Sequence, residues 1–225
     1  LTHLNGERLD KLDLKNEQDA QNAVTKIKAS NFAVSKVEKK QSRRNPAPPF
    51  TTSTLQQEAA RKLHFGAKKT MQTAQRLYEG VTLNGETTGL ITYMRTDGVS
   101  ISQEAITGIR DYVSSAYGSK YIPTNSRVYT TKAKNAQEAH EAVRPTDIKR
   151  LPKELTMLDE DQRKLYQLIW NRTAASQMEQ AVLDQVAVDI RPQGTSEIDN
   201  EITLRATGSI IAFDGFLRVY QEGKD

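Results

Sequence analysis

The 225-residue sequence contains no cysteine. This absence excludes a disulfide framework, a zinc site built on thiolates and a cysteine nucleophile. It is also typical of a protein that stays in the cytosol, where disulfides are rare. The longest apolar runs, such as residues 210–212, are far shorter than the roughly 18 residues that a membrane span requires. The sequence therefore predicts no membrane partner.

An excess of charge of one sign is also missing. The 32 Lys and Arg residues are set against 28 Asp and Glu residues, which leaves a net charge of +4. Such a small excess permits an anionic partner without requiring one. The length allows one large domain or two smaller ones. The chain opens Leu1-Thr2-His3, with neither an initiator methionine nor a signal segment, so we expect it to be a piece of a longer protein.

The hydrophobic pattern changes twice along the chain. Residues 1–49 predict a helix over about 17–29 and a strand from residue 32, and they end with three prolines within residues 46–49, which mark a boundary. Residues 50–178 are mostly helical in pattern. After residue 178, apolar and polar residues alternate over 186–191, 202–206 and 210–219, which is typical of a small antiparallel sheet.

Helix boundaries can be predicted inside the middle region. Ser53 with Gln56, and Ser100 with Gln103, have the spacing of capping boxes, so helices are expected to begin near residues 54 and 101. Two further helices are expected over about 67–79 and 159–178. Because the flanks resemble each other, we predict an α+β multidomain fold. In it, a helical domain of residues 50–178 is inserted into an antiparallel β-containing domain made of residues 1–49 and 179–225.

The segment most suggestive of chemistry is residues 89–98, GLITYMRTDG. If it is extended, Tyr93 and Arg95 project from the same side. A tyrosine can attack a phosphodiester, although an unperturbed pKa near 10 leaves only about 0.1% phenolate at pH 7. A neighbouring guanidinium would stabilise the phenolate and the charge that develops on the phosphoryl oxygens. Taken alone, a Tyr-x-Arg pair in a strand is more often a packing feature than a catalytic one.

Four segments together resemble the bacterial type IA DNA topoisomerases. Residues 90–97, LITYMRTD, resemble the active-site motif of that family, and residues 135–146, NAQEAHEAVRPT, resemble its second motif at the expected distance. Residues 49–57 and 68–79 are similar to the helical segments that precede the tyrosine. Met94 and Arg144 resemble the topoisomerase I branch rather than topoisomerase III.

The resemblance implies roles for individual residues. Tyr93 would be the nucleophile that forms a 5′-phosphotyrosyl link, and Arg95 would hold the scissile phosphate. His140 would lie near the DNA backbone, although a helix-surface histidine is the simpler interpretation without the family. Gln137 and Arg144 would contact DNA or support the site. The implied parent enzyme is a monomer of the bacterial cytoplasm, associated with the nucleoid, that relaxes negatively supercoiled DNA by transient cleavage, strand passage and religation without ATP.

Two features depart from the family pattern. The family usually has a serine at the position of Gly98, and we expect little loss from this difference. The resemblance also implies a toprim domain that supplies a catalytic glutamate and an acidic Mg²⁺ site, but this sequence has no Asp-x-Asp-x-Glu motif. The acids at 159–161 are better explained by the dipole of the helix that they begin. We therefore expect no metal and no cofactor in this chain, with Mg²⁺ used only by the full-length enzyme.

Without the toprim domain, the chain alone is expected to be inactive in relaxation, and it could instead act as a non-catalytic DNA-binding or structural module. Recurrent basic residues usually form solvated faces, but together they could attract a DNA backbone. These residues are Arg43, Arg44, Arg61, Lys62, Lys68, Lys69 and Arg76. The alternatives to Tyr93 as nucleophile are Tyr78, Tyr112, Tyr117, Tyr121, Tyr129, Tyr166 and Tyr220.

Overall fold

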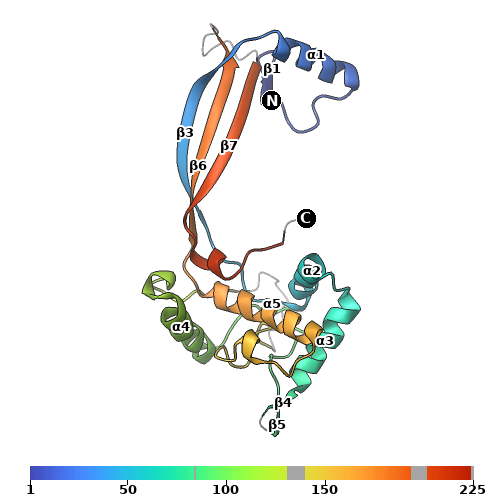
Figure 1. The fold of residues 1–225 in the computed structure, drawn as a ribbon, viewed down its shortest axis with the longest axis vertical. Helices are drawn as coiled ribbons and strands as arrows, with labels where there is room; N and C mark the ends of the chain where they lie inside the picture. The colour runs from blue at the N-terminus through green and yellow to red at the C-terminus, as the bar shows by residue number, and fades with distance from the viewer. Residues whose placement is uncertain (84, 131–139, 194–201, 224–225) are drawn as a thin grey trace. The chain divides into compact units, whose positions relative to one another are not determined.

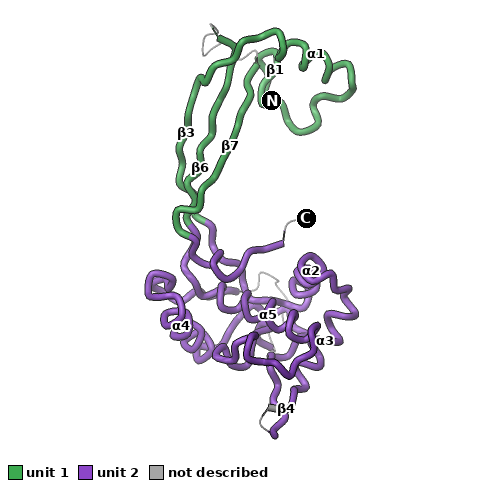
Figure 2. Tube along the Cα trace, in the orientation of Figure 1, with its two compact units in different colours: residues 1–43, 182–213 green, residues 44–181, 214–225 purple. Residues whose placement is uncertain are grey.

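The structure is a computed structural model that describes residues 1–83, 85–130, 140–193 and 202–223. The chain divides into two compact units (Figure 2). Unit 1 consists of residues 1–43 and 182–213, and unit 2 consists of residues 44–181 and 214–225. Among the described residues, no helix is long and apolar enough to cross a membrane.

Unit 1 is built on a five-stranded sheet with the strand order β2-β1-β7-β6-β3 (Figure 1). Its strands are β1 (His3–Leu4), β2 (Glu7–Arg8), β3 (Phe32–Arg44), β6 (Ala181–Pro192) and β7 (Ile202–Phe213). β7 pairs antiparallel with both β6 and β1. The register places His3 opposite Thr203, so the sheet unites strands from distant parts of the sequence.

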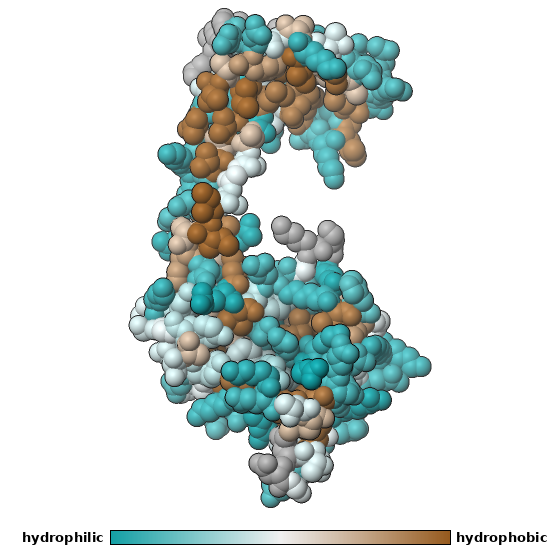
Figure 3. Space-filling model, in the orientation of Figure 1, coloured by the Kyte–Doolittle hydropathy of each residue, from teal (hydrophilic) through white to brown (hydrophobic). Residues whose placement is uncertain are grey.

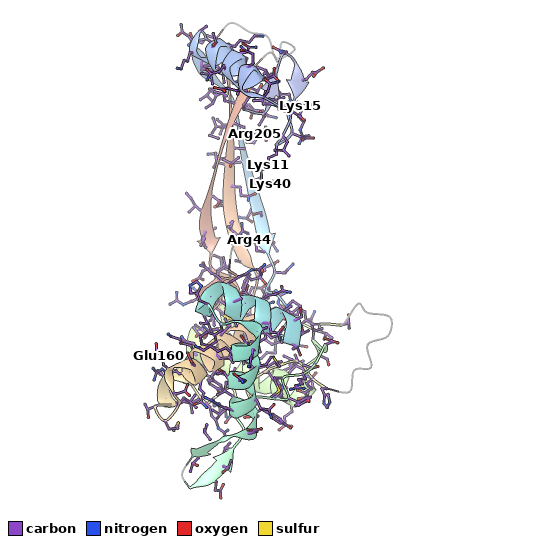
Figure 4. The ribbon with its side chains drawn as sticks, turned by 90° about the vertical axis from the view of Figure 1, so that its right-hand side faces the viewer. Lys11, Lys15, Lys40, Arg44, Glu160 and Arg205 are labelled. Atoms are coloured by element: carbon purple, nitrogen blue, oxygen red, sulfur yellow. The ribbon has the colours of Figure 1, made fainter. Side chains whose placement is uncertain are left out.

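Side chains on this sheet are held partly by charge. Asp189 on β6 is 6% exposed and lies opposite Arg205 on β7. The Arg205 guanidinium donates to both carboxylate oxygens, at 2.6 and 2.7 Å, and these hydrogen bonds lower the pKa of Asp189. Figure 4 shows Arg205 projecting from the sheet. Apolar side chains such as Val34 and Ile210 remain exposed, and Figure 3 shows apolar surface over the strands.

Polar side chains cap α1, α2, α4 and α5, whereas α3 begins after Gly66 without a side-chain cap. Asn16 caps α1, Thr51 forms a capping box with Thr54 at α2, Ser102 caps α4, and Asp159 caps α5. Such caps satisfy backbone N–H groups that have no partner within the helix. The helices are α1 (Glu17–Lys28) in unit 1, and α2 (Thr52–Leu63), α3 (Ala67–Glu79), α4 (Gln103–Tyr117) and α5 (Glu160–Ser176) in unit 2.

α5 is the central helix of unit 2. It packs against α2, α3 and α4 (Figure 1), and its Leu165, Tyr166 and Ile169 are fully buried. The indole N–H of Trp170 donates to the backbone of Ile148 at 2.9 Å, which satisfies the polar end of a buried aromatic side chain. Among its described residues, unit 2 also has short 3-10 helices at Ser119–Tyr121, Pro152–Glu154 and Gly215–Arg218.

A two-stranded hairpin of β4 (Val81–Leu83) and β5 (Glu86–Thr88) separates α3 from the segment that carries Tyr93. Glycines close its base. A Cβ atom on Gly80 would lie 2.8 Å from the backbone of Thr88, and one on Gly89 would lie 2.7 Å from the Tyr78 carbonyl oxygen. This hairpin was not predicted from the sequence, although the Asn-Gly pair at 84–85 is a typical hairpin signal.

Helices combined with an antiparallel sheet confirm the predicted fold class. The helix expected over 67–79 matches α3, while α2 begins two residues before its predicted start and α4 two residues after it. The predicted strand over 210–219 is confirmed only as far as Phe213. β7 runs without interruption to Phe213, and residues 215–218 form a 3-10 helix, because Gly215 adopts a φ of +49° that ends the strand.

The boundaries of the units also differ from those expected at 49/50, 178/179 and the C-terminus. The segment from Asp214 onward belongs to unit 2, not to the sheet. Tyr220 is 4% exposed and donates to the carboxylate of Glu58 on α2 at 2.6 Å. Phe216 is also buried, and its N–H donates to the Glu179 carbonyl oxygen. Two aromatic side chains therefore anchor this segment to the helical core.

Candidate active site around Tyr93

Tyr93 lies in a short irregular segment that runs beside residues 142–146. Ile91 and Pro145 form an isolated antiparallel bridge, and the Thr92 N–H donates to the Arg144 carbonyl oxygen at 2.9 Å. The Thr92 hydroxyl donates to the Ala142 carbonyl oxygen at 2.7 Å and accepts from the Arg144 N–H at 3.0 Å. These contacts join the two predicted motifs through their backbones.

The side chains of the Tyr93 segment differ in how far they are buried, and this determines which of them a substrate can reach. Ile91 and Met94 are 1% and 0% exposed, so both are fixed in the core of unit 2. Tyr93 is half-buried, and Arg95 is exposed. The segment is not extended throughout, since residues 94–95 form a bend. The buried Met94 side chain anchors this bend between the two candidate catalytic residues.

The Tyr93 ring contacts two other aromatic rings. Its centroid lies 5.0 Å from that of His140, with an interplanar angle of 59°, and 5.4 Å from that of Tyr78, with an angle of 66°. Tilted and edge-on contacts of this kind are favourable between aromatic rings. The structure thus brings together Tyr93 and His140, which the sequence analysis selected from separate motifs. The His140 side chain is exposed, so it remains accessible to a substrate.

Gly98 holds the His140 backbone close to the Tyr93 segment. The Thr96 hydroxyl accepts from the Gly98 N–H at 2.9 Å and donates to the His140 carbonyl oxygen at 3.3 Å. A Cβ atom on Gly98 would lie only 2.4 Å from that carbonyl oxygen. The expectation that a glycine in place of serine removes only a hydroxyl is therefore incomplete, because the glycine also allows this close backbone approach.

A threonine that the sequence analysis missed fixes the backbone on both sides of Arg95. The Thr52 hydroxyl, in the first turn of α2, donates to the Met94 carbonyl oxygen and accepts from the Thr96 N–H, both at 2.8 Å. The Thr52 N–H also donates to the Thr96 carbonyl oxygen at 2.9 Å. Nothing in the sequence distinguishes Thr52 from the threonines around it, so only the structure reveals this contact.

Arg95 lines an open cavity of about 580 Å³ along one face of α3. Lys68 and Arg76 contribute two further cations, and the described residues that line the cavity include no carboxylate. The remaining lining residues are Met71, Gln72 and Gln75. A groove with three cations and two amides can bind a polyanion through charge and hydrogen bonds without reading its sequence.

The other predicted basic residues are mostly engaged elsewhere. Lys69 pairs with Asp161 at 2.8 Å, and Lys62 lies 3.7 Å from the Glu58 carboxylate. Arg61 also lies near Glu58, at 3.5 Å. Arg43 and Arg44 are at the end of β3; Figure 4 labels Arg44. Arg76 itself lies 3.7 Å from the Asp159 carboxylate. Within the described chain, Lys68 and Arg76 are the members of the predicted basic set that line the groove with Arg95.

Arg144 supports the site from within. Its guanidinium donates to the Glu141 carboxylate at 2.6 Å and to the Pro145 carbonyl oxygen at 2.9 Å, and its side chain is 15% exposed. These contacts leave it less available for DNA than Arg95. Gln137, the other candidate for DNA contact, lies outside the described residues.

Six of the seven alternative tyrosines are harder to ionise than an ordinary tyrosine. Burial raises the pKa of Tyr129 to about 12 and raises the pKa of Tyr112, Tyr117, Tyr166 and Tyr220. The hydrogen bond that the Tyr121 hydroxyl donates to Asp214 raises the pKa of that tyrosine. A raised pKa disfavours the nucleophilic phenolate. Tyr78, the remaining alternative, contacts the Tyr93 ring.

The acids at 159–161 lie at the start of α5, and each also has a structural partner. Asp159 accepts from the Gln162 N–H at 2.7 Å as the cap of α5, and Asp161 pairs with Lys69. Figure 4 labels Glu160, which pairs with Lys164 at 2.6 Å. Across the described residues, no three His, Asp or Glu side chains are grouped so that they could hold a metal ion.

Comparisons with known proteins agree on one family. The family model for DNA topoisomerase matches residues 3–225. DNA topoisomerase 1 of Rickettsia felis is 54% identical over 226 residues, and that of Xylella fastidiosa (strain Temecula1) is 46% identical over 230 residues. Each of these matches covers 100% of this chain and 28% of the relative. The chain thus spans less than a third of the length of these curated relatives.

A solved structure extends the likeness to the fold. Full-length topoisomerase I from Thermotoga maritima matches with a TM-score of 0.74 and 30% sequence identity. The match covers 99% of this chain and 37% of that chain. The arrangement of helices and sheet described above therefore recurs within a longer protein.

Proposed function

Because the chain belongs to the type IA DNA topoisomerase family, we propose that its full-length protein cleaves one DNA strand with Tyr93 as the nucleophile. The Tyr93 oxygen attacks the phosphorus of a phosphodiester, and the bond from phosphorus to the 3′-oxygen breaks. The phenol gives up its proton as its oxygen bonds to phosphorus, and the released 3′-oxygen takes up a proton, so the products are a 5′-phosphotyrosyl ester and a 3′-hydroxyl. The observation that carries this proposal is the contact between Tyr93 and His140, at 5.0 Å between ring centroids.

The neighbouring residues suit the charge changes of this reaction. Arg95 holds the scissile phosphate, since its planar guanidinium can donate to two phosphoryl oxygens at once. The groove that it shares with Lys68 and Arg76 holds the adjoining backbone. The His140 ring assists through a hydrogen bond or a positive charge next to the phosphate. Arg144 orients the His140 segment through Glu141.

The covalent link explains why the proposed reaction needs no ATP. A phosphotyrosyl ester keeps the free energy of the broken phosphodiester bond, so the 3′-hydroxyl can reverse the attack without ATP. While one strand is held through Tyr93, another strand can pass, and negatively supercoiled DNA relaxes. In this proposal both units act as the gate for that passage in a monomeric cytoplasmic enzyme, bound to the nucleoid. Mg²⁺ would be held by acidic residues outside this chain.

For the chain alone, a second function is favoured by the missing acidic ligands. The described residues provide a nucleophile and a basic groove but no grouped acids for a metal. In isolation the chain then binds DNA without relaxing it. Incubation of the 225-residue chain with negatively supercoiled plasmid and Mg²⁺ should leave the plasmid supercoiled. Relaxed topoisomers in that assay would refute the need for the remaining domains.

Replacement of the nucleophile is the direct test. In the full-length protein, Tyr93→Phe should abolish the covalent adduct with a labelled single-stranded oligonucleotide, because phenylalanine has no oxygen to attack phosphorus. Binding to the same oligonucleotide should be unchanged. Tyr78→Phe is the matched control, since Tyr78 contacts the Tyr93 ring and is exposed. An adduct that survives in Tyr93→Phe but disappears in Tyr78→Phe would identify the other tyrosine as the nucleophile.

Replacement of Arg95 separates catalysis from binding. We expect Arg95→Ala to slow adduct formation by about 100-fold or more, as for the loss of a charged donor that stabilises a transition state. Lys68→Ala, on the same groove, should instead weaken binding and lower the salt dependence of affinity by about one ion. Single-turnover cleavage at saturating protein, together with equilibrium binding, distinguishes the two effects. Equal losses in rate and affinity for Arg95→Ala would reduce its role to backbone contact.

A further inference from the structure

Few contacts restrain the side chain of the proposed nucleophile. The described residues form no hydrogen bond to the Tyr93 hydroxyl, and the Tyr93 ring meets the rings of His140 and Tyr78. A tyrosine side chain rotates among separate staggered positions, and each position would place the phenolic oxygen at a different point. Where that oxygen lies therefore depends on the two ring contacts.

The backbone around Tyr93 is, by contrast, fixed. Thr92 is joined to the segment 142–144 by hydrogen bonds of 2.7, 2.9 and 3.0 Å, and Met94 is 0% exposed. Rotation of the Tyr93 side chain then decides whether its oxygen can meet a phosphate. A residue that limits this rotation can affect cleavage without contacting DNA.

The backbone of Tyr78 is held beside the Tyr93 segment. The Leu90 N–H donates to the Leu77 carbonyl oxygen at 2.8 Å, and both leucines are 0% exposed. A Cβ atom on Gly89 would lie 2.7 Å from the Tyr78 carbonyl oxygen, so the glycine allows this close approach. The β4–β5 hairpin leaves the end of α3 and returns to it (Figure 1). Tyr78 therefore has a defined place next to the nucleophile although it lies 15 residues earlier.

Burial does not explain why a tyrosine stands at position 78. The buried residues of α3 are Thr70, Thr73, Ala74 and Leu77, whereas Tyr78 is 41% exposed. Among the described residues, the Tyr93 ring is the aromatic partner of Tyr78. An exposed ring whose described aromatic contact is the nucleophile is better explained by that contact than by the core of the unit.

The geometry of the contact suits a restraint on rotation. The two ring centroids lie 5.4 Å apart with an interplanar angle of 66°, an edge-on arrangement. Such a contact depends on the orientation of both rings, and its usual strength changes the population of a side-chain position by about two- to tenfold. His140 also contacts the Tyr93 ring, but in the proposed reaction it acts next to the phosphate.

We infer that Tyr78 is a positioning residue, which keeps Tyr93 in the side-chain position from which its oxygen attacks phosphorus. This inference rests on the proposed function. The same position keeps the phosphotyrosyl ester within reach of the 3′-hydroxyl, so the Tyr78 ring speeds cleavage and religation alike. The equilibrium between the intact strand and the covalent adduct is then independent of Tyr78.

Tyr78→Leu in the full-length protein tests the inference, because leucine removes the ring and still favours a helix. Single-turnover cleavage of a labelled single-stranded oligonucleotide should slow by about three- to tenfold, as the loss of an oriented ring contact implies. Religation, followed as the adduct disappears after a shift to high salt, should slow by the same factor. The affinity for the oligonucleotide and the fraction of adduct at equilibrium should change by less than about twofold.

Two variants serve as controls for the ring itself. Tyr78→Phe keeps the ring and should retain the unaltered rates of cleavage and religation. Tyr117→Leu removes a tyrosine at the end of α4, whose ring centroid lies 6.1 Å from that of Tyr121, and it should change neither rate. Unaltered rates in Tyr78→Leu would overturn the inference, and so would a loss of affinity as large as the loss of rate.

Fluorine NMR of the 225-residue chain, labelled with fluorotyrosine, tests the contact without cleavage. The Tyr93 signal is the one that disappears in Tyr93→Phe. It should shift in Tyr78→Leu, because the neighbouring ring current is lost, and it should not shift in Tyr117→Leu. A Tyr93 signal that stays in place in Tyr78→Leu would overturn the inference.

Failure of the inference can be distinguished from failure of the proposed function. If Tyr93→Phe still forms the covalent adduct, Tyr93 is not the nucleophile, and both fail. If Tyr93→Phe forms no adduct while Tyr78→Leu cleaves at the unaltered rate, only the positioning role of Tyr78 fails.

Discussion

Removal of the Thr52 hydroxyl should disturb the site more than its distance from the chemistry suggests. That hydroxyl donates to the Met94 carbonyl oxygen and accepts from the Thr96 N–H, so it spans the backbone on both sides of Arg95. Met94 is 0% exposed and Thr96 is 8% exposed, which leaves little room for water to replace it. Thr52→Val keeps the shape of the side chain and removes both hydrogen bonds.

The expected loss of stability follows from the two backbone groups, the Met94 carbonyl and the Thr96 N–H, that would lose their hydrogen-bond partner. A buried polar group that loses its partner costs about 1–3 kcal/mol, so Thr52→Val should destabilise unit 2 by about 2–4 kcal/mol after relaxation of the bend. Any such relaxation moves Arg95, and a misplacement of about 1 Å can slow an oriented reaction by about 100-fold. Thr52→Ser keeps the hydroxyl and should approach the unaltered protein in both stability and rate.

Urea unfolding and single-turnover adduct formation in the full-length protein measure the two effects. We expect Thr52→Val to lower the rate of cleavage while the affinity for single-stranded DNA stays within about twofold, since the groove residues of α3 are untouched. Thr52→Ser should show neither loss. If the valine variant unfolds and cleaves like the serine variant, the hydroxyl does not position Arg95.

Two further variants test other contacts. Gly98→Ser should slow adduct formation by about tenfold or more, because the new Cβ atom would lie 2.4 Å from the His140 carbonyl oxygen. Unaltered single-turnover rates would show that the backbone can shift without slowing cleavage. Tyr220→Phe should destabilise the chain by about 1.5–3 kcal/mol, the usual value of a hydrogen bond to a charged group, as measured by urea unfolding. Burial opposes ionisation of Glu58, but hydrogen bonds from Tyr220 and Gly223 and the Lys62 charge lower its pKa below the ordinary 4.5. The ionised Glu58 carboxylate therefore contributes its full stabilisation above pH 4.5, and this contribution is lost as the pH falls through the lower pKa of Glu58 in the folded protein. Tyr220→Phe should make the free energy of unfolding fall less steeply with decreasing pH.

The fold could be predicted where the local pattern is strong. α3 matches its prediction at both ends because apolar residues recur at helical spacing and Gly80 stops the helix. The starts of α2 and α4 were displaced by two residues, because Thr51 and Ser102 act as caps although Ser53 and Ser100 have the expected spacing. Capping is decided by backbone geometry, which neighbouring hydroxyl residues in a sequence do not reveal.

The conformation of the C-terminal segment is determined by contacts with residues that are distant in the sequence. Residues 210–219 alternate like a strand, yet Tyr220 is held by Glu58 of α2, more than 160 residues earlier. The Asp214 carboxylate accepts from the Tyr121 hydroxyl at 2.7 Å. Such tertiary contacts override a local preference for extended structure, and no pattern within the segment itself predicts them.

In the candidate site too, some residues can be identified from the sequence and others only from the tertiary structure. Tyr93, Arg95 and His140 could be selected from their motifs, but Thr52 could not, because its role exists only when α2 lies against the bend. The residues that hold the site are threonines. The hydroxyls of Thr52, Thr92 and Thr96 bond to backbone groups that a regular sheet would have paired.

This use of threonine explains how an irregular segment can hold a nucleophile firmly. Buried backbone groups need partners, and a strand ladder would supply them but would also alternate side chains between two faces. Here isolated bridges at Phe50–Val143 and Ile91–Pro145, together with the threonine hydroxyls, satisfy the backbone without a ladder. Met94 can then turn into the core while Tyr93 and Arg95 both remain accessible. The hydroxyl that bonds on both sides of Arg95 belongs to Thr52, which is why we expect its loss to affect cleavage rather than DNA affinity.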